Sequence, residues 1–116
     1  KSTMMQQAND KIDELRGKML KKTYESAYLY YKIGQYYAAS VALTNFLKDF
    51  PEYDNAEKVD YLVVKALKKY ADGSYRGKQE ERRQEEQKAF EAFKIKYTKS
   101  AYIQELEKHH HKKKKK

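Results

Sequence analysis

Residues 30–51 read YYKIGQYYAASVALTNFLKDFP and decide how this chain is expected to fold. Six of these residues are aromatic, and the segment holds a single glycine, Gly34, and ends at the chain's only proline, Pro51. One helical pattern of apolar residues ends at Ile33 and another begins at Tyr36, so Gly34 is expected in a turn between two helices. The stretch therefore predicts an antiparallel helical hairpin.

Apolar residues recur at helical spacing on both sides of this turn. Before it, one apolar face is expected to carry Leu20, Tyr24, Ala27, Tyr30 and Tyr31, with Tyr28 on the opposite face. After it, the buried stripe is expected to comprise Tyr36, Ala39, Leu43, Phe46, Leu47 and Phe50. Because small Ala27 and Ala39 would let two helix backbones approach, we interpret the surrounding rings as core rather than as a ligand cage.

Helical patterns continue in both directions from the hairpin. Residues 3–33 contain no proline and repeat Ala8, Ile12, Leu15 and Met19 at intervals of three and four, which predicts one long helix, or two with a bend at Gly17. A third helix is expected from Asp54, with Glu57 completing a capping-box pattern, to Asp72. A fourth helix over 77–97 and a short one after residue 100 follow. No segment alternates as a strand would, so the fold class is all-α.

A shift of the chain against itself by 47 residues exposes a repeat. SVALTNFLKDFPEY, residues 40–53, then aligns with QKAFEAFKIKYTKS, residues 87–100. Leu43 aligns with Phe90 and Phe46 with Phe93, so both segments predict the same buried stripe. A period of this length built from helix pairs is typical of an α-solenoid, in which each hairpin is buried only against its neighbours.

The net charge of +9 is concentrated at one end of the chain. Six of the 26 basic residues are Lys108 and Lys112–Lys116, and every acidic residue lies at or before Glu107. The remaining 20 basic and 17 acidic residues are interleaved, which is typical of a solvated helical surface rather than of a phosphate-binding stripe. We therefore expect residues 1–107 to form one helical unit and residues 108–116 a disordered basic tail.

Residue types that carry catalysis or bind metals are scarce. The chain has no cysteine, and its only histidines are His109, His110 and His111 in the lysine-rich end. The carboxylates of residues 80–86 lie one helical turn from one another but also beside Arg82 and Arg83, so a salt-bridged face is the plainer interpretation. No glycine-rich phosphate loop and no nucleophile elbow is present. We expect no catalytic residue, no metal site and no cofactor, and hence a protein that is not an enzyme.

One family resemblance rests on residues spread over most of the chain, about 8–106. They are Ile12, Leu15, Arg16, Lys18, Tyr24, Ala27, Tyr30, Tyr31, Gly34, Tyr36, Ala38, Ala39, Leu47 and Pro51. In this order and spacing the chain resembles the C-terminal half of the BamD family, tetratricopeptide-like lipoproteins of the outer-membrane β-barrel assembly machinery. Two positions depart from the family pattern, since Ala42 replaces a common arginine and Thr98 replaces the repeat-closing proline.

The resemblance implies a fold, a partner and a cellular location. The fold would be a short right-handed α-solenoid of tetratricopeptide-like hairpins, and residues 1–107 would be the C-terminal repeat region of a longer protein. The function would be that of a non-catalytic scaffold that docks other subunits of the assembly complex, including a BamA-like one. The location would be the periplasmic face of the bacterial outer membrane, with membrane attachment only through a lipid anchor upstream of Lys1.

Two classes of partner remain open from the residues themselves. Tyrosines expected on outward faces beside lysines are typical of protein-binding surfaces, so Tyr28, Lys32, Tyr37 and Lys48 are the candidate partner-binding residues. The alternative is a nucleic-acid or anionic-surface binding module that uses the basic tail. We favour the protein partner and expect no nucleic acid.

Overall fold

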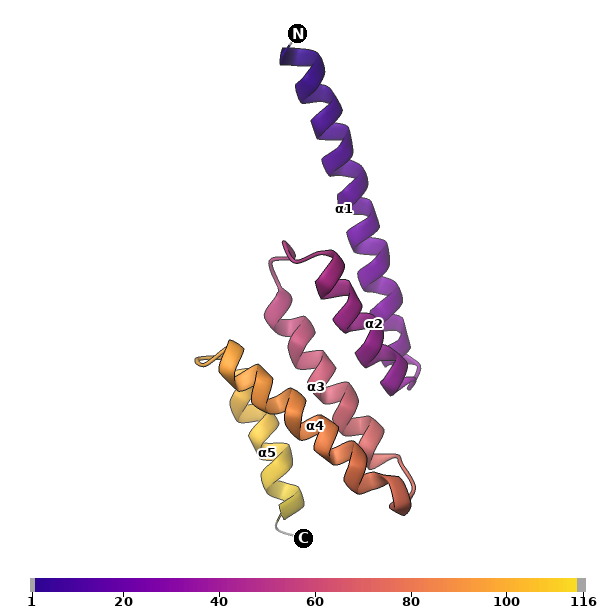
Figure 1. The fold of residues 1–116 in the computed structure, drawn as a ribbon, viewed down its shortest axis with the longest axis vertical. Helices are drawn as coiled ribbons and strands as arrows, with labels where there is room; N and C mark the ends of the chain where they lie inside the picture. The colour runs from indigo at the N-terminus through magenta and orange to yellow at the C-terminus, as the bar shows by residue number, and fades with distance from the viewer. Residues whose placement is uncertain (1, 115–116) are drawn as a thin grey trace.

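The computed structural model describes the backbone of residues 2–114 and the side chains of residues 8–108. Over this range the chain forms five helices and no strand, so the predicted all-α class is confirmed. The helices are α1 (Ser2–Lys32), α2 (Tyr36–Asp49), α3 (Ala56–Asp72), α4 (Arg76–Lys96) and α5 (Tyr102–Lys114). Figure 1 shows α3 between α2 and α4, so these neighbours in sequence are neighbours in space, and α5 lies beside α4 and also contacts α3 through Tyr102 and Tyr61.

The turn between α1 and α2 forms as predicted. Gly34 has a φ of +87°, in the left-handed region that a side chain disfavours. The Gln35 N–H donates to the Tyr30 carbonyl at 2.9 Å and the Gly34 N–H donates to the Tyr31 carbonyl at 3.2 Å. These two bonds make a Schellman motif, which ends α1 and turns the chain back along it.

The core lies where α1, α2, α3 and α4 meet. Phe46 and Leu43 of α2 are completely buried, and Ala27 of α1 and Ala39 of α2 are buried as expected. The residues paired by the 47-residue shift also agree, because Phe90 and Phe93 of α4 are buried like their counterparts in α2. Burial of these rings supplies most of the driving force for packing the helices.

Two tyrosines of α1 exchange the faces expected of them. Tyr30 was expected in the core but is 43% exposed, whereas Tyr28 was expected outside but is half-buried and packs against the core. The covered stripe runs along Leu20, Tyr24, Ala27 and Tyr31. With about 100° between successive helical residues, Tyr28 lies about 70° to one side of this stripe and Tyr30 about 90° to the other. The rest of the fold covers the side that carries Tyr28.

Three boundaries differ from the sequence expectation. Helix α1 is continuous through Gly17, so the alternative of two helices is wrong. Helix α3 starts at Ala56 after Asn55, without a side-chain capping bond, so the capping box expected at Asp54 does not form. Helix α5 continues to Lys114, past residue 107, where the expected disordered tail begins. Lysine is a good helix former and each added residue extends an existing helix at little cost, which accounts for this extension.

The molecule is elongated, with principal extents of 67 × 29 × 18 Å. Its radius of gyration of 17.6 Å exceeds the value of about 13 Å expected for a compact chain of this length. The N-terminal half of α1 accounts for much of the length, because it projects beyond the ends of α2 and α3 (Figure 1). Within residues 2–114, none of the helices has the length and apolarity needed to cross a bilayer.

Candidate protein-interaction surface

Tyrosine rings from four helices lie in two neighbouring groups that together we call the tyrosine face; Tyr61 is buried and the other four rings are half-buried. Its members are Tyr28 and Tyr31 of α1, Tyr36 of α2, Tyr61 of α3 and Tyr102 of α5. The Tyr28 and Tyr31 rings stack with centroids 6.1 Å apart, and Tyr36 meets Tyr31 edge-on at 5.6 Å. The Tyr61 and Tyr102 rings stack at 4.0 Å.

A hydrogen bond and an ion pair join the α3 and α5 parts of the tyrosine face. The Tyr61 hydroxyl donates to the Glu105 carboxylate, and Lys65 lies 3.8 Å from the same carboxylate. Burial and then the bond to Glu105 raise the pKa of Tyr61 well above its usual range. Burial also raises the pKa of Tyr31, with smaller contributions from Tyr36, Tyr28 and Glu105. The phenol groups of Tyr31 and Tyr61 are therefore neutral hydrogen-bonding groups at physiological pH.

Lysines lie over the outer rings of this surface. The ammonium groups of Lys32, Lys65 and Lys69 lie 5.9, 5.3 and 5.7 Å from the ring centroids of Tyr28, Tyr61 and Tyr36. These distances fall within the range of cation–π contacts, which hold a lysine over a ring without neutralising its charge. The surface therefore combines flat amphipathic rings with positive charge.

The structure divides the four predicted partner-binding residues into two pairs. Tyr28 and Lys32 lie on the tyrosine face, although the Tyr28 ring is half-buried rather than outward. Tyr37 and Lys48 are both exposed on another stripe of α2, three helical turns apart. The Tyr37 ring is 50% exposed and packs 5.1 Å from Tyr70 of α3. The four residues therefore do not form one patch.

Four residues of the tyrosine face and its lysines, Tyr61, Lys65, Lys69 and Tyr102, were not among the predicted partner-binding residues. No repeat pairs Tyr61 with an aromatic residue. One signal was available, since Tyr61 and Lys65 repeat the four-residue spacing of Tyr28 and Lys32. A tyrosine followed by a lysine one turn later places the ammonium group over the ring, as both pairs do here.

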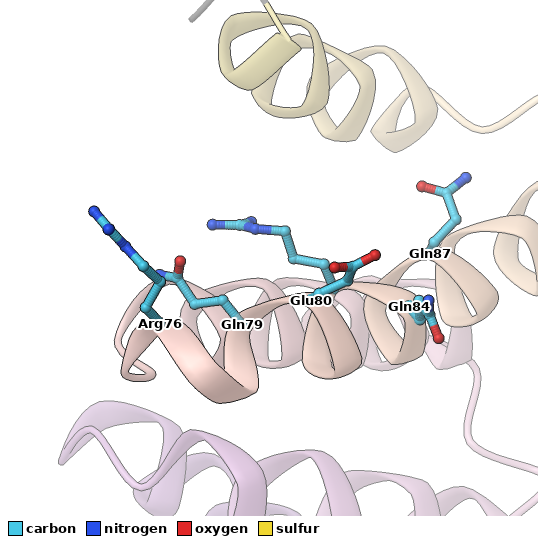
Figure 2. Close-up of a pocket in the computed structure, with 6 residues that line it drawn as sticks. Arg76, Gln79, Glu80, Gln84 and Gln87 are labelled. Carbon is cyan, nitrogen blue, oxygen red and sulfur yellow. The ribbon is translucent and has the colours of Figure 1, made fainter.

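A surface hollow on α4 has a different character. Its lining comes from this helix alone, namely Arg76, Gln79, Glu80, Arg83, Gln84 and Gln87, around a volume of about 410 Å³. Figure 2 shows the labelled members spread along a single face of α4. Arg83 is also held 3.1 Å from Asp72. Ligand sites are usually concave and mostly apolar, so this polar, one-helix hollow does not have their character.

Metal-binding side chains do not cluster within the described part of the chain, residues 8–108. The three histidines at 109–111 lie outside the described side chains, so the expectation of no metal site there stays a prediction.

Comparison with known proteins adds no family assignment. No family model matches the chain, and no curated protein matches it.

Proposed function

We propose that this chain is a non-catalytic helical docking module that binds a partner protein through the tyrosine face. The observation that carries the proposal is the set of tyrosine rings from four helices, four half-buried and one buried, with three lysines held over them. Tyrosine rings offer large contact areas at low cost in conformational entropy, which is why they are enriched in binding hot spots. A partner segment with acidic and aromatic side chains would suit such a surface.

The tetratricopeptide-like arrangement belongs to the same proposal. Each helix packs on the next one along the chain, and the 47-residue repeat places equivalent rings of α2 and α4 in the core. These two features support a short right-handed α-solenoid. Solenoids bind partners along extended surfaces made by successive repeats, as the tyrosine face would be.

The resemblance to the BamD family supports a more specific partner and address. On that basis the partner is another subunit of the outer-membrane β-barrel assembly complex, BamA-like in character. The site of action is then the periplasmic face of the outer membrane, reached through an upstream lipid anchor. This part of the proposal depends on the sequence resemblance alone.

The test compares two charge-reversed pairs with the same change in net charge. Lys32→Glu with Lys69→Glu alters the tyrosine face, whereas Lys48→Glu with Lys88→Glu alters exposed lysines outside it. Binding of the periplasmic domain of a BamA-like subunit is measured by calorimetry. We expect the first pair to weaken binding about tenfold or more and the second pair to change it little.

Three results would contradict the proposal in different ways. Equal loss in both pairs would indicate attraction by overall charge rather than by the tyrosine face. Full binding by both pairs would place the contact elsewhere on the molecule. Absence of binding by the parent chain would rule out that partner. Thermal melting of all variants shows whether the fold is preserved.

A further inference from the structure

A second apolar stripe runs along α1 on a side that α2 does not cover. It consists of Ala8, Ile12, Leu15 and Met19, which we call the α1 seam. Ile12, Leu15 and Met19 are 60%, 60% and 61% exposed, and every side chain from residue 8 to residue 19 is exposed. Large apolar side chains gathered in this way usually mark an interaction site.

The spacing of the seam indicates what kind of surface would cover it. The four residues follow one another at intervals of four, three and four, the a and d positions of a coiled coil. The same pattern continues through Lys22 and Ser26 to Leu29 and Ile33, which are 52% and 61% exposed. A stripe confined to a and d positions fits another helix, whereas a helix lying on a membrane needs a broader apolar face.

The fold holds the seam away from the rest of the molecule. Arg16 donates to the Asp49 carbonyl at 2.7 Å and to the Glu52 carboxylate at 2.6 Å, so the end of α2 is fastened to α1 at this level. The guanidinium group also lies 4.7 Å from the centre of the Phe50 ring. Beyond this point α1 projects past the ends of α2 and α3 (Figure 1). The seam thus lies in an accessible position on the part of α1 that projects from the fold.

Charges around the seam are sorted by sign. The charged residues in the flanking e and g positions are Lys11, Arg16 and Lys18, all cations, while Asp10, Asp13 and Glu14 occupy the other half of the helix. Lys18 lies 3.6 Å from Glu14, but both side chains are largely exposed and such surface pairs are weak. Arg16 is already paired with Glu52, so Lys11 and Lys18 are the flanking residues that present positive charge to whatever covers the seam.

We propose that the α1 seam is the docking site for an acidic amphipathic helix of a partner protein. Its leucine-like side chains would fill the a and d positions, and its Glu or Asp residues would face Lys11 and Lys18. A second copy of this chain fits less well, because pairing the seam with itself brings lysine and arginine flanks together. The seam lies apart from the tyrosine face, so this proposal does not rest on the function proposed above.

The test uses two synthetic peptides of about four heptads with leucine at a and d. One carries glutamate at every e and g position and the other carries lysine. Binding to the full chain is followed by fluorescence anisotropy of the labelled peptides. We expect the acidic peptide to bind and the basic one to bind at least about tenfold more weakly.

Substitutions in α1 test whether the acidic peptide binds at the seam. Leu15→Glu with Met19→Glu should abolish binding of the acidic peptide, and Lys11→Glu with Lys18→Glu should reverse the preference toward the basic peptide. Lys21→Glu, off the seam on the same helix, is the matched control and should bind as the parent does. All these side chains are exposed, so the melting temperature should hardly change.

Several outcomes would overturn the proposal. Equal binding of both peptides, or binding that survives Leu15→Glu with Met19→Glu, would show that the seam is not an acidic-helix site. Self-association in sedimentation equilibrium that these two substitutions abolish would make a second copy the occupant. Binding to phosphatidylglycerol vesicles, lost in the same variant and without binding of the acidic peptide, would make it a membrane contact.

Discussion

Phe46 shows at the scale of one residue how this fold is held together. Its ring is completely buried and lies 5.6 Å from Tyr24, 5.5 Å from Phe50 and 5.2 Å from Tyr53. The ring thus connects α1, α2 and the loop that leads to α3. Tyr30, by contrast, lies on the exposed side of α1.

The two rings should respond very differently to truncation. Phe46→Ala should lower the free energy of unfolding by about 3–5 kcal/mol, because it leaves a cavity in the core. Tyr30→Ala should change it by less than about 1 kcal/mol, because Tyr30 is 43% exposed and lies outside the core. Urea denaturation followed by circular dichroism measures both. Similar losses in the two variants would mean that Tyr30 is buried after all.

Glu86, also a single residue, is expected to make the stability of the fold depend on pH. Its side chain is almost completely buried in α4, and burial raises the pKa of its carboxyl group, opposed by Lys68 and Arg83. A carboxyl whose pKa is higher in the folded chain than in the unfolded chain binds more protons when folded. Its contribution to stability is therefore most favourable below the ordinary pKa of glutamate and falls as the pH rises through the raised value.

Replacement of Glu86 by glutamine should remove this loss of stability at higher pH. We compare the melting temperature of Glu86→Gln with that of the parent at each pH. The difference, variant minus parent, should be larger at pH 8 than at pH 4. Glu85→Gln, an exposed neighbour, is the matched control and should show little such trend. A stability difference between Glu86→Gln and the parent that is the same at both pH values would contradict the assignment.

At the scale of the helix, two glycines occupy opposite environments. Gly17 lies inside the continuous helix α1, and a methyl group added there would contact nothing within 4 Å. Gly34 lies in the turn with a φ of +87°, and a methyl group there has space but a strained backbone. Helical alanine is favoured over glycine, whereas left-handed alanine is disfavoured.

The same substitution should therefore have opposite effects at the two positions. Gly17→Ala should stabilise α1 by up to about 1 kcal/mol, and Gly34→Ala should destabilise the fold by about 1 kcal/mol. Helical content at 222 nm and thermal melting measure both. A stabilising Gly34→Ala would argue against the Schellman turn and the hairpin built on it.

At the scale of the whole molecule, contacts are mainly between successive helices. Helix α5 is attached through the buried side chain of Leu106 and through Tyr102, which stacks on Tyr61. Beyond Lys108 the side chains lie outside the described part of the chain. Six of the nine residues from 108 to 116 are lysines, and none is apolar, so they offer nothing to the core.

Deletion of residues 108–116 should leave the melting temperature almost unchanged. It should also abolish any salt-sensitive binding to duplex DNA or anionic vesicles, while binding of a protein partner at the tyrosine face persists. A fall of more than a few degrees would show that this end packs on the body. Loss of protein binding on deletion would favour the alternative module that uses the basic tail.

Much of the candidate surface could not be predicted because it is assembled from separate helices. Tyr31 and Tyr36 are close in sequence and belong to the predicted hairpin. Tyr61 and Tyr102 are 41 positions apart, and nothing in their spacing indicates that their rings stack at 4.0 Å. Their meeting depends on how α5 packs on α3, which the sequence pattern of either helix does not state.

The sequence by itself determined the helices, the Gly34 turn and the core stripe of α2, because each depends on local backbone preference and on periodicity within one helix. The tertiary structure alone decided which side of α1 is covered. Tyr28 and Tyr30 flank the same stripe at similar angles, so periodicity cannot distinguish them. Likewise the sequence does not show that the N-terminal half of α1 projects past α2 and α3, which leaves Ile12, Leu15 and Met19 exposed. A helical pattern specifies which residues share a face, whereas contact between helices selects the face that is buried.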